Sequence, residues 1–236
     1  AAYSIEALRI FQRAVDALPV GYGSSKSTQS LETEQGKKAL ELIKTQADFL
    51  IGKAKEKNGL YATVYNVTNG SKEGADLGTQ FAVIRGLTAA YLATKNNKYR
   101  QEARELMISI EKNMYDKKIG TYVDASKEYT PYTIGAVSGG LRSAISNLKN
   151  TGFEKKPVLE LKNLTERFTR WFQLVINGNS VNDGAQLAEW LLDSGEYETA
   201  SMTTSNNDED NVPPINKAGG KFGTAPTMAG KVKLSN

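Results

Sequence analysis

The sequence predicts a mainly α-helical protein built from repeated helical hairpins, with short β-hairpin insertions and an extended C-terminal tail. Three observations predict this fold. Apolar residues recur every three or four positions over long segments, as they do on one face of a helix. Two shorter segments alternate apolar and other residues after a glycine turn, which is typical of strands. The same order of turn, strand and helix pair then recurs, which indicates internal repetition.

Most of the chain has the helical pattern. The first helix carries Ile5 and Phe11 on one face, follows Ser4 as a predicted N-cap, and ends before Pro19. The Gly- and Ser-rich residues 20–31 form a predicted loop after it. Helices are expected over residues 4–18, 32–52, 77–94, 97–114, 134–149, 159–177 and 184–195.

Two short strands are expected between these helices, over residues 58–66 (NGLYATVYN) and 117–125 (KKIGTYVDA). A polar turn follows each strand, and a helix rich in small residues follows each turn. A third copy of this order begins at residue 178 with GNSVND. The spacing between equivalent residues shortens along the chain, so we expect an irregular repeat of hairpins rather than a strict solenoid.

Two pairs of segments carry a resemblance to a known family. They are NGLYATVY with GADLGTQFAVIRGLTAAYLAT, and IGTYVDA with YTPYTIGAVSGGLRSAISNL. This pattern resembles the α/α-toroid, or six-hairpin, superfamily, whose members include glycoside hydrolases, polysaccharide lyases and epimerases that act on sugars. The resemblance covers residues 32–195 and implies a partial toroid, because fewer hairpins fit here than the six of a closed ring.

The chain is expected to divide into three parts. Residues 1–31 form an N-terminal helix and a Gly/Ser-rich loop, and residues 32–200 form the toroid-like hairpins. Residues 201–236 form an acidic loop and an extended tail. The tail ends with alternating Val232 and Leu234 and predicts an arm or edge strand, which packs back on the domain or pairs with another subunit.

The chain has no Cys and no His, which excludes several classes of site. Haem attachment, zinc and Fe–S sites lose their usual ligands, and Ser-His-Asp or Cys-His catalysis is impossible. A bound metal would be Ca²⁺ or Mg²⁺ held by oxygen atoms, and acid/base chemistry would use Asp, Glu, Tyr or Lys. The missing histidines also disfavour the epimerase branch that the resemblance implies.

Charge and hydropathy limit the partners. The net charge is +4, but the lysines are spread along the chain without interleaved aromatic residues, so no nucleic-acid surface is predicted. No apolar run is long enough for a membrane span. A start without Met and loops rich in Asn, Ser, Thr and Gly favour an exported protein, either secreted or periplasmic.

The resemblance implies that the loops before the inner helices line one mouth of the toroid. Asp76, Glu128, Tyr132 and Asp183 are therefore the candidate catalytic residues of a carbohydrate-active enzyme. The alternative is structural, because Asp76 and Asp183 each stand just before an apolar helix, where Asp is a favoured N-cap.

Two arginines and two tryptophans each have a structural interpretation and a ligand-binding interpretation. Arg85 and Arg142 lie within apolar helices and predict either an ion pair with a carboxylate of the protein or a ligand carboxylate. Trp171 and Trp190 are expected to pack in the core, with stacking on a sugar ring as the alternative.

The acidic segment SNNDEDNVPP is a candidate calcium loop. Asn206, Asp208 and Asp210 fit the alternating oxygen ligands of such loops, but the closing Glu of an EF-hand is absent. The alternative is a solvated acidic linker without bound Ca²⁺.

Two function classes fit these residues. The first is an exported, non-catalytic binding or scaffolding subunit that contacts a partner protein or a glycan and takes part in an oligomer. The second is a glycoside hydrolase or polysaccharide lyase that uses the mouth carboxylates.

Overall fold

A computed structural model describes residues 1–16, 33–124, 128–129, 131–151, 155–178 and 232–233. This part of the chain is mostly helical, as the sequence predicted. Its α-helices are α1 (Ala2–Asp16), α2 (Glu34–Phe49), α3 (Leu77–Thr94), α4 (Asn97–Met114), α5 (Pro131–Asn147) and α6 (Leu161–Gly178). A π-helical turn, η1 (Leu50–Ala54), continues α2, and a 3₁₀ turn, η2 (Pro157–Leu159), precedes α6.

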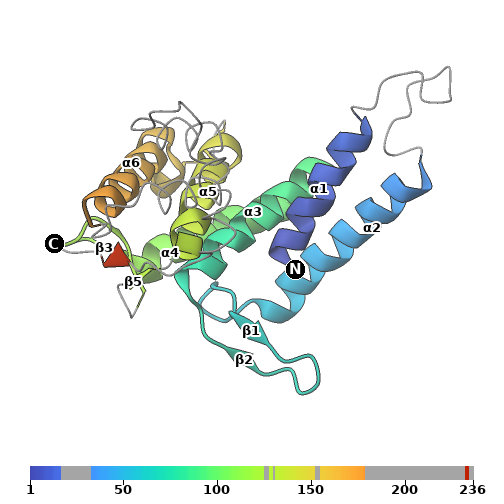
Figure 1. Cartoon of the computed structure of the whole chain (residues 1–236), viewed down its shortest axis with the longest axis horizontal. Helices are drawn as coiled ribbons and strands as arrows, with labels where there is room; N and C mark the ends of the chain where they lie inside the picture. Colours follow the sequence, from blue (N-terminus) through green and yellow to red (C-terminus); the bar gives the residue numbers. More distant parts are fainter. Residues whose placement is uncertain (17–32, 125–127, 130, 152–154, 179–231, 234–236) are drawn as a thin grey trace, which may run out of the picture.

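Helix α3 is the central element of the fold. It packs against α1 on one side and α5 on the other, and it also contacts α2 and α4. Helix α1 pairs with α2, and α5 pairs with α6. Figure 1 shows the α1–α2 pair and the α5–α6 pair on opposite sides of α3.

Capping residues explain where the central helices begin and end. The Asp76 carboxylate caps α3 by accepting from the backbone N–H of Thr79, and the Asn96 side chain caps α4 by accepting from that of Lys98. Lys95 adopts the left-handed conformation, with φ 58°, and ends α3 at a tight corner before α4. These local signals place both helices over the residues that the sequence predicted.

The core is centred on α3, which is apolar on nearly every side, as predicted. Leu77, Phe81, Ile84 and Leu87 are all fully buried within it. Trp171 of α6 is also fully buried, so its predicted place in the core is confirmed. Burial of such large apolar side chains is the main stabilising contribution to the helical assembly.

Two glycines allow the neighbouring helices to approach α3 closely. A Cβ atom at Gly86 would lie 2.9 Å from the backbone of Ala2 at the start of α1. A Cβ atom at Gly140 of α5 would lie 2.9 Å from the backbone oxygen of Phe81. Both distances are shorter than van der Waals contact, so these glycines set how closely α1 and α5 pack on α3.

The β structure is shorter than expected. Strands β1 (Val64–Tyr65) and β2 (Lys72–Glu73) form one antiparallel pair before α3. Strands β3 (Tyr115–Asp116) and β4 (Thr121–Tyr122) form another after α4. The predicted strands over 58–66 and 117–125 were therefore too long, because most of their backbone does not pair with a second strand.

Strand β5 (Glu128–Tyr129) pairs with β6 (Val232–Lys233), which joins the chain's last described residues to the segment before α5. The rest of the predicted tail lies outside the described residues, as do the expected helix over 184–195 and the loop over 20–31. The internal repeat and the toroid-like ring stay predictions.

One local prediction about the first helix was wrong. Helix α1 begins at Ala2, so Ser4 lies within its first turn and is not the N-cap. The carbonyl of Ala1 accepts the first helical hydrogen bond, from the backbone N–H of Ile5 at 3.0 Å. Within the described ranges, no helix combines the length and apolar character that a membrane crossing requires.

Candidate functional site

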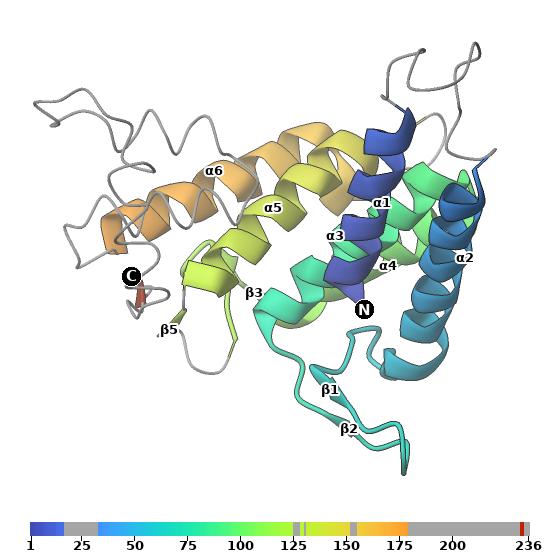
Figure 2. The same ribbon diagram turned by 45° about the vertical axis from the view of Figure 1, so that its right-hand side comes forward.

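An open groove runs over α3 between α1 and α5, which we call the α1–α3–α5 groove. Figure 2 shows α1 and α5 on either side of α3, which lies between and behind them. The groove has a volume of about 350 Å³, at the small end of the range for ligand sites. The polar residues that line it include Glu6 and Arg9 from α1, Arg85 and Thr88 from α3, and Arg142 and Ser143 from α5.

An ion pair joins two walls of the groove. Arg85 donates to Oε1 of Glu6 from Nη2 at 2.9 Å and from Nε at 3.2 Å. Both side chains are largely buried, which strengthens the pair relative to one in water. The structural interpretation of Arg85 is therefore confirmed, because its carboxylate partner belongs to the protein.

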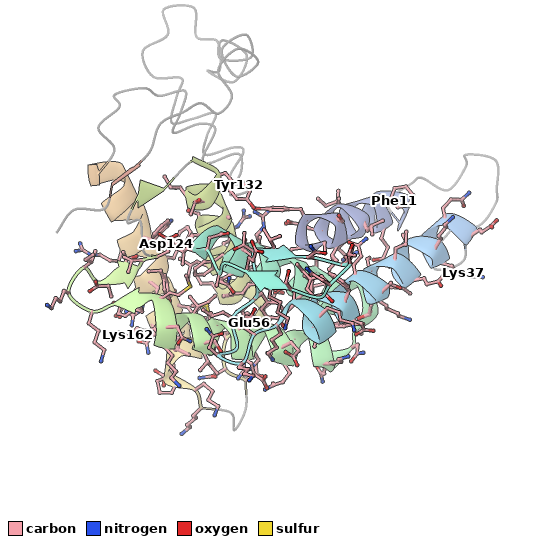
Figure 3. The ribbon with its side chains drawn as sticks, turned by 90° about the horizontal axis from the view of Figure 1, so that it is seen from below. Phe11, Lys37, Glu56, Asp124, Tyr132 and Lys162 are labelled. Atoms are coloured by element: carbon pink, nitrogen blue, oxygen red, sulfur yellow. The ribbon has the colours of Figure 1, made fainter. Side chains whose placement is uncertain are left out.

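Two tyrosines lie together toward the start of α3, outside the residues that line the groove. The rings of Tyr3 in α1 and Tyr132 in α5 have centroids 6.0 Å apart and are tilted by 54°. The guanidinium of Arg85 lies 5.4 Å from the centroid of the Tyr3 ring, within the range of a cation–π contact. Both rings are partly open to solvent, with Tyr3 39% and Tyr132 49% exposed. Figure 3 shows Tyr132 and Phe11 along the same edge of the molecule.

The remaining polar lining comes from α1 and α5. Arg9 donates from Nη1 to Oε1 of Gln12 at 3.2 Å, and Arg142 is exposed. Ser143 and Ser146 add hydroxyl groups on the α5 wall. The described lining thus has three arginines, Arg9, Arg85 and Arg142, and a single carboxylate, Glu6, so its formal charge is positive.

Thr88 contributes a polar atom with an unusual environment. Its side chain lines the groove on the α3 side, and the residue is only 2% exposed. Its hydroxyl oxygen has no hydrogen-bond partner among the residues that the structure describes. Buried polar groups are nearly always paired, so this buried hydroxyl is an exception on the α3 wall of the groove.

Asp76, a predicted catalytic candidate, has a structural role. Its Oδ1 accepts from the backbone N–H of Thr79 at 2.7 Å. Its Oδ2 accepts from the hydroxyls of Thr63 at 2.5 Å and Thr79 at 2.9 Å. The N-cap interpretation is therefore confirmed for Asp76, whose two oxygens are both engaged in holding the start of α3.

The structure brings Tyr132 to the same end of α3 as Asp76. A Cβ atom at Gly78 would lie 3.4 Å from Oδ1 of Asp76 and 3.5 Å from Cε1 of Tyr132. Glu128 lies in β5 opposite Lys233, a few residues before α5. Asp183 lies outside the described residues, so its predicted place near the other candidates stays a prediction.

The candidate calcium ligands Asn206, Asp208 and Asp210 also lie outside the described residues. Within the part of the chain that the structure describes, no group of three carboxylates comes together in a way that could hold a metal ion. The arginine-rich groove is likewise unsuited to a cation. A calcium site at the acidic loop therefore stays a prediction.

A second polar cluster, remote from the groove, is structural. Arg167 of α6 pairs with Glu111 of α4 at 2.7 Å and lies 3.9 Å from the centroid of the Tyr115 ring. The hydroxyl of Tyr122 donates to the same carboxylate at 2.8 Å. Burial, and then the charge of Glu111, raise the pKa of the Tyr122 hydroxyl well above its usual value. This cluster joins α4, α6 and the β3–β4 pair.

Sequence reasoning missed much of the groove. Glu6, Arg9 and Thr88 were not singled out, and neither was Tyr3. The helical spacing of Glu6 and Arg9 on α1 was a usable signal, because residues three positions apart lie on the same face of a helix. What they contact depends on α3 and α5, which are distant in sequence.

Comparison of the chain with models of protein families and with curated proteins gives no match. The geometry and charge of the groove are therefore the basis for a functional proposal.

Proposed function

We propose that this protein is a non-catalytic binding subunit that holds a glycan in the α1–α3–α5 groove. One observation carries the proposal. Hydrogen-bonding side chains line the groove, and two partly exposed tyrosine rings lie together beside it, one of them against Arg85 of its lining. The single described carboxylate of the lining is already paired with an arginine.

The lining suits a sugar. A sugar presents many hydroxyl groups, which require donors and acceptors, and apolar ring faces, which pack on aromatic rings. Arg142, Ser143 and Ser146 supply the polar groups, and Tyr3 and Tyr132 supply the aromatic surface. The tyrosines lie on two different helices that both pack on α3, so the platform is held by rigid elements.

Binding is favoured over glycoside hydrolysis because Glu6 in the groove and the candidate Asp76 are both committed elsewhere. Hydrolysis of a glycosidic bond ordinarily uses two carboxyl groups on either side of the bond. Glu6 is held by Arg85, and Asp76 caps α3 through both of its oxygens. Neither carboxylate is arranged to transfer a proton to a ligand in the groove.

The wider parts of the proposal rest on the sequence. The toroid resemblance rests on the two pairs of sequence segments that carry it. The composition of the loops supports export. An exported glycan-binding subunit of a larger assembly is the function that combines these features.

The test is binding of the full chain to an array of glycans. We expect a defined subset of glycans to retain the protein, and we expect Tyr132→Ala to abolish that retention while the protein stays folded, because Tyr132 is exposed. Val67→Ala, at a residue that is 79% exposed in the β1–β2 loop, is the matched control and should bind normally. An array that does not retain the unmodified protein, or that retains the unmodified protein and Tyr132→Ala equally, would contradict the proposal.

A further inference from the structure

We infer that Asn69 is a site of covalent modification, at which the side-chain amide is converted to aspartate and isoaspartate without an enzyme. The chemistry favours an Asn that is followed by Gly, because glycine has no side chain to hinder the backbone nitrogen that reacts. Three such pairs occur in the sequence, Asn58–Gly59, Asn69–Gly70 and Asn177–Gly178. Their surroundings differ, and this difference selects Asn69. The inference is independent of glycan binding.

The reaction proceeds through a cyclic imide. The backbone nitrogen of Gly70 loses its proton to a base from solvent and attacks Cγ of Asn69. The bond between Cγ and Nδ2 breaks, and Nδ2 takes up a proton and leaves as ammonia. Water then adds to either carbonyl of the imide and opens the ring, which gives aspartate or isoaspartate at position 69. One water molecule is consumed and one ammonia molecule is released, with no change in oxidation state.

The loop between β1 and β2 gives the reacting atoms room to move. Asn69 and Gly70 are both exposed in this loop. Figure 1 and Figure 2 show the β1–β2 hairpin projecting away from the helices. A Cβ atom at Gly70 would lie 3.7 Å from the hydroxyl oxygen of Tyr65, which is an ordinary contact distance. The backbone can therefore rearrange into the imide without displacing packed side chains.

A hydrogen bond within the loop prepares the Asn69 amide for attack. The N–H of Ser71 donates to Oδ1 of Asn69 at 2.9 Å. This bond stabilises the negative charge that develops on Oδ1 as the nitrogen attacks Cγ. The N–H of Gly70 donates to the carbonyl oxygen of Asn66 at 2.8 Å, and this bond has to open before the nitrogen can react. Opening costs little at an exposed loop, because water replaces the lost partner.

Asn58–Gly59 is an internal control, because its hydrogen bonds are equivalent. The N–H of Leu60 donates to Oδ1 of Asn58 at 3.0 Å, and the N–H of Gly59 donates to the carbonyl oxygen of Glu56 at 3.0 Å. The packing is different, however. Leu60 is buried, and a Cβ atom at Gly59 would overlap Oγ of Ser109 in α4. Formation of the imide would have to displace this packed segment, so Asn58 should react slowly in the folded protein.

The third pair lies in a helix. Asn177 and Gly178 are the last residues of α6. A helical backbone fixes both dihedral angles of each residue, so the end of α6 would have to unwind before the imide could form. Only the Asn69–Gly70 pair is therefore both outside a helix and free of packed neighbours at its glycine.

The product should disturb the hairpin. Isoaspartate places one additional carbon atom in the backbone between residues 69 and 70. The N–H of Asn66 donates to the carbonyl oxygen of Ser71 at 2.9 Å and closes the loop. The additional atom changes the span that this bond closes, and the adjacent pairing of Tyr65 with Lys72 should weaken with it.

The test is incubation of the full chain at physiological temperature and mildly alkaline pH. Proteolytic peptides that contain each Asn–Gly pair are then analysed by mass spectrometry, and isoaspartate is labelled with a methyltransferase specific for it. A parallel incubation in urea measures the three pairs in the unfolded chain. The variants are Asn69→Gln, whose longer side chain cannot form the same ring, and the control Asn58→Gln.

We expect Asn69 to be converted several-fold faster than Asn58 or Asn177 in the folded protein, and the three rates to become similar in urea. The rate at Asn69 should fall at mildly acidic pH, because the attacking nitrogen has to lose its proton. Asn69→Gln should remove most of the isoaspartate formed by the folded protein, and Asn58→Gln should leave it unchanged.

Two results would overturn the inference. The first is an Asn69 that stays unmodified in the folded protein while it reacts in urea, because the loop would then hold the amide in place. The second is an equal rate at Asn58 and Asn69 in the folded protein, because the packing around Gly59 would then have no influence. Neither result bears on the proposed glycan binding.

Discussion

The side-chain amide of Gln80 and the backbone of Tyr61 form a reciprocal pair of hydrogen bonds inside the protein. Nε2 of Gln80 donates to the carbonyl oxygen of Tyr61, and Oε1 of Gln80 accepts from the N–H of Tyr61, each at 2.8 Å. Gln80 and Tyr61 are both fully buried. The pair joins α3 to the segment before β1, where Tyr61 also forms an isolated antiparallel bridge with Lys55.

Replacing Gln80 with Leu should destabilise the protein strongly. The variant fills a similar volume but leaves the N–H and C=O of Tyr61 buried without partners. We expect the free energy of unfolding to fall by roughly 2–4 kcal/mol, as measured by urea denaturation. Gln101→Leu, on the exposed face of α4, is the matched control and should change the stability by less than about 0.5 kcal/mol. A similar small loss in both variants would show that the pair contributes little.

Arg104 should be as important for stability as Gln80, because its side chain, on α4, caps the end of α5. Nη1 of Arg104 donates to the carbonyl oxygens of Leu148 at 2.6 Å and Lys149 at 3.2 Å. A cation at this position also interacts favourably with the helix dipole. We expect Arg104→Met to lower the free energy of unfolding by roughly 2–3 kcal/mol. If thermal or urea unfolding gives Arg104→Met a free energy of unfolding within about 0.5 kcal/mol of that of the unmodified protein, this role is rejected.

Helix boundaries and the core were largely predictable from local sequence. Asp76, Asn96 and the apolar residues of α3 act within a few positions of one another, so their pattern is visible in the sequence. The groove was not predictable in the same way. Glu6 and Arg85 are separated by 79 positions, and their pairing exists because α1 packs on α3 beside Gly86. Tyr3 and Tyr132 come together for the same reason.

The protein should lose stability at alkaline pH. Burial, and then the charge of Asp48, raise the pKa of Tyr99 to about 12, and the pKa of Tyr122 is also raised. An unfolded tyrosine titrates near pH 10. Since the folded state holds these protons more tightly, the stabilisation is complete below about pH 10 and is lost as pH rises toward about 12.

The measurement is the free energy of unfolding in urea as a function of pH over that range. Tyr99→Phe should make the decline shallower, because it removes one of the titrating groups. Tyr132→Phe, at an exposed ring, is the control and should leave the slope unchanged. A slope that is the same in the unmodified protein and in Tyr99→Phe would contradict this assignment.

Thr88→Val separates a binding role from a structural one. The valine keeps the shape of the side chain and removes a buried hydroxyl that has no partner among the described residues. We expect the free energy of unfolding to stay constant or rise by about 1 kcal/mol, while the affinity for the glycan stays unchanged, because the hydroxyl oxygen itself is buried. The stability is measured in urea and the affinity by titration.

Thr94→Val is the contrasting variant on the same helix. The Thr94 hydroxyl donates to the carbonyl oxygen of Ala90 at 2.7 Å and accepts from the N–H of Asn96 at 3.1 Å. Its removal should lower the stability without affecting the affinity. If Thr88→Val instead loses affinity at constant stability, the hydroxyl contacts the ligand, and the assignment of a purely buried hydroxyl is wrong.

Asp76 provides a test of its capping role. Asp76→Ala removes the acceptor for Thr79 and should lower the free energy of unfolding by about 1–2 kcal/mol, whereas Asp76→Asn retains an acceptor and should lose less. Both variants should keep full affinity for the glycan, because the carboxylate faces Thr63 and Thr79. Loss of binding in a stable Asp76→Asn protein would instead place this carboxylate at the ligand.

The central claim is that the ligand occupies the α1–α3–α5 groove. The most direct measurement is hydrogen–deuterium exchange of the full chain, with and without the glycan that binds most tightly on the array. The account predicts slower exchange in the ligand-bound protein for peptides from α1, from residues 85–92 of α3 and from residues 139–147 of α5, with no change in α2 or α4. Protection confined to α2, α4 or the β1–β2 pair, with α1 and α5 unchanged, would contradict it.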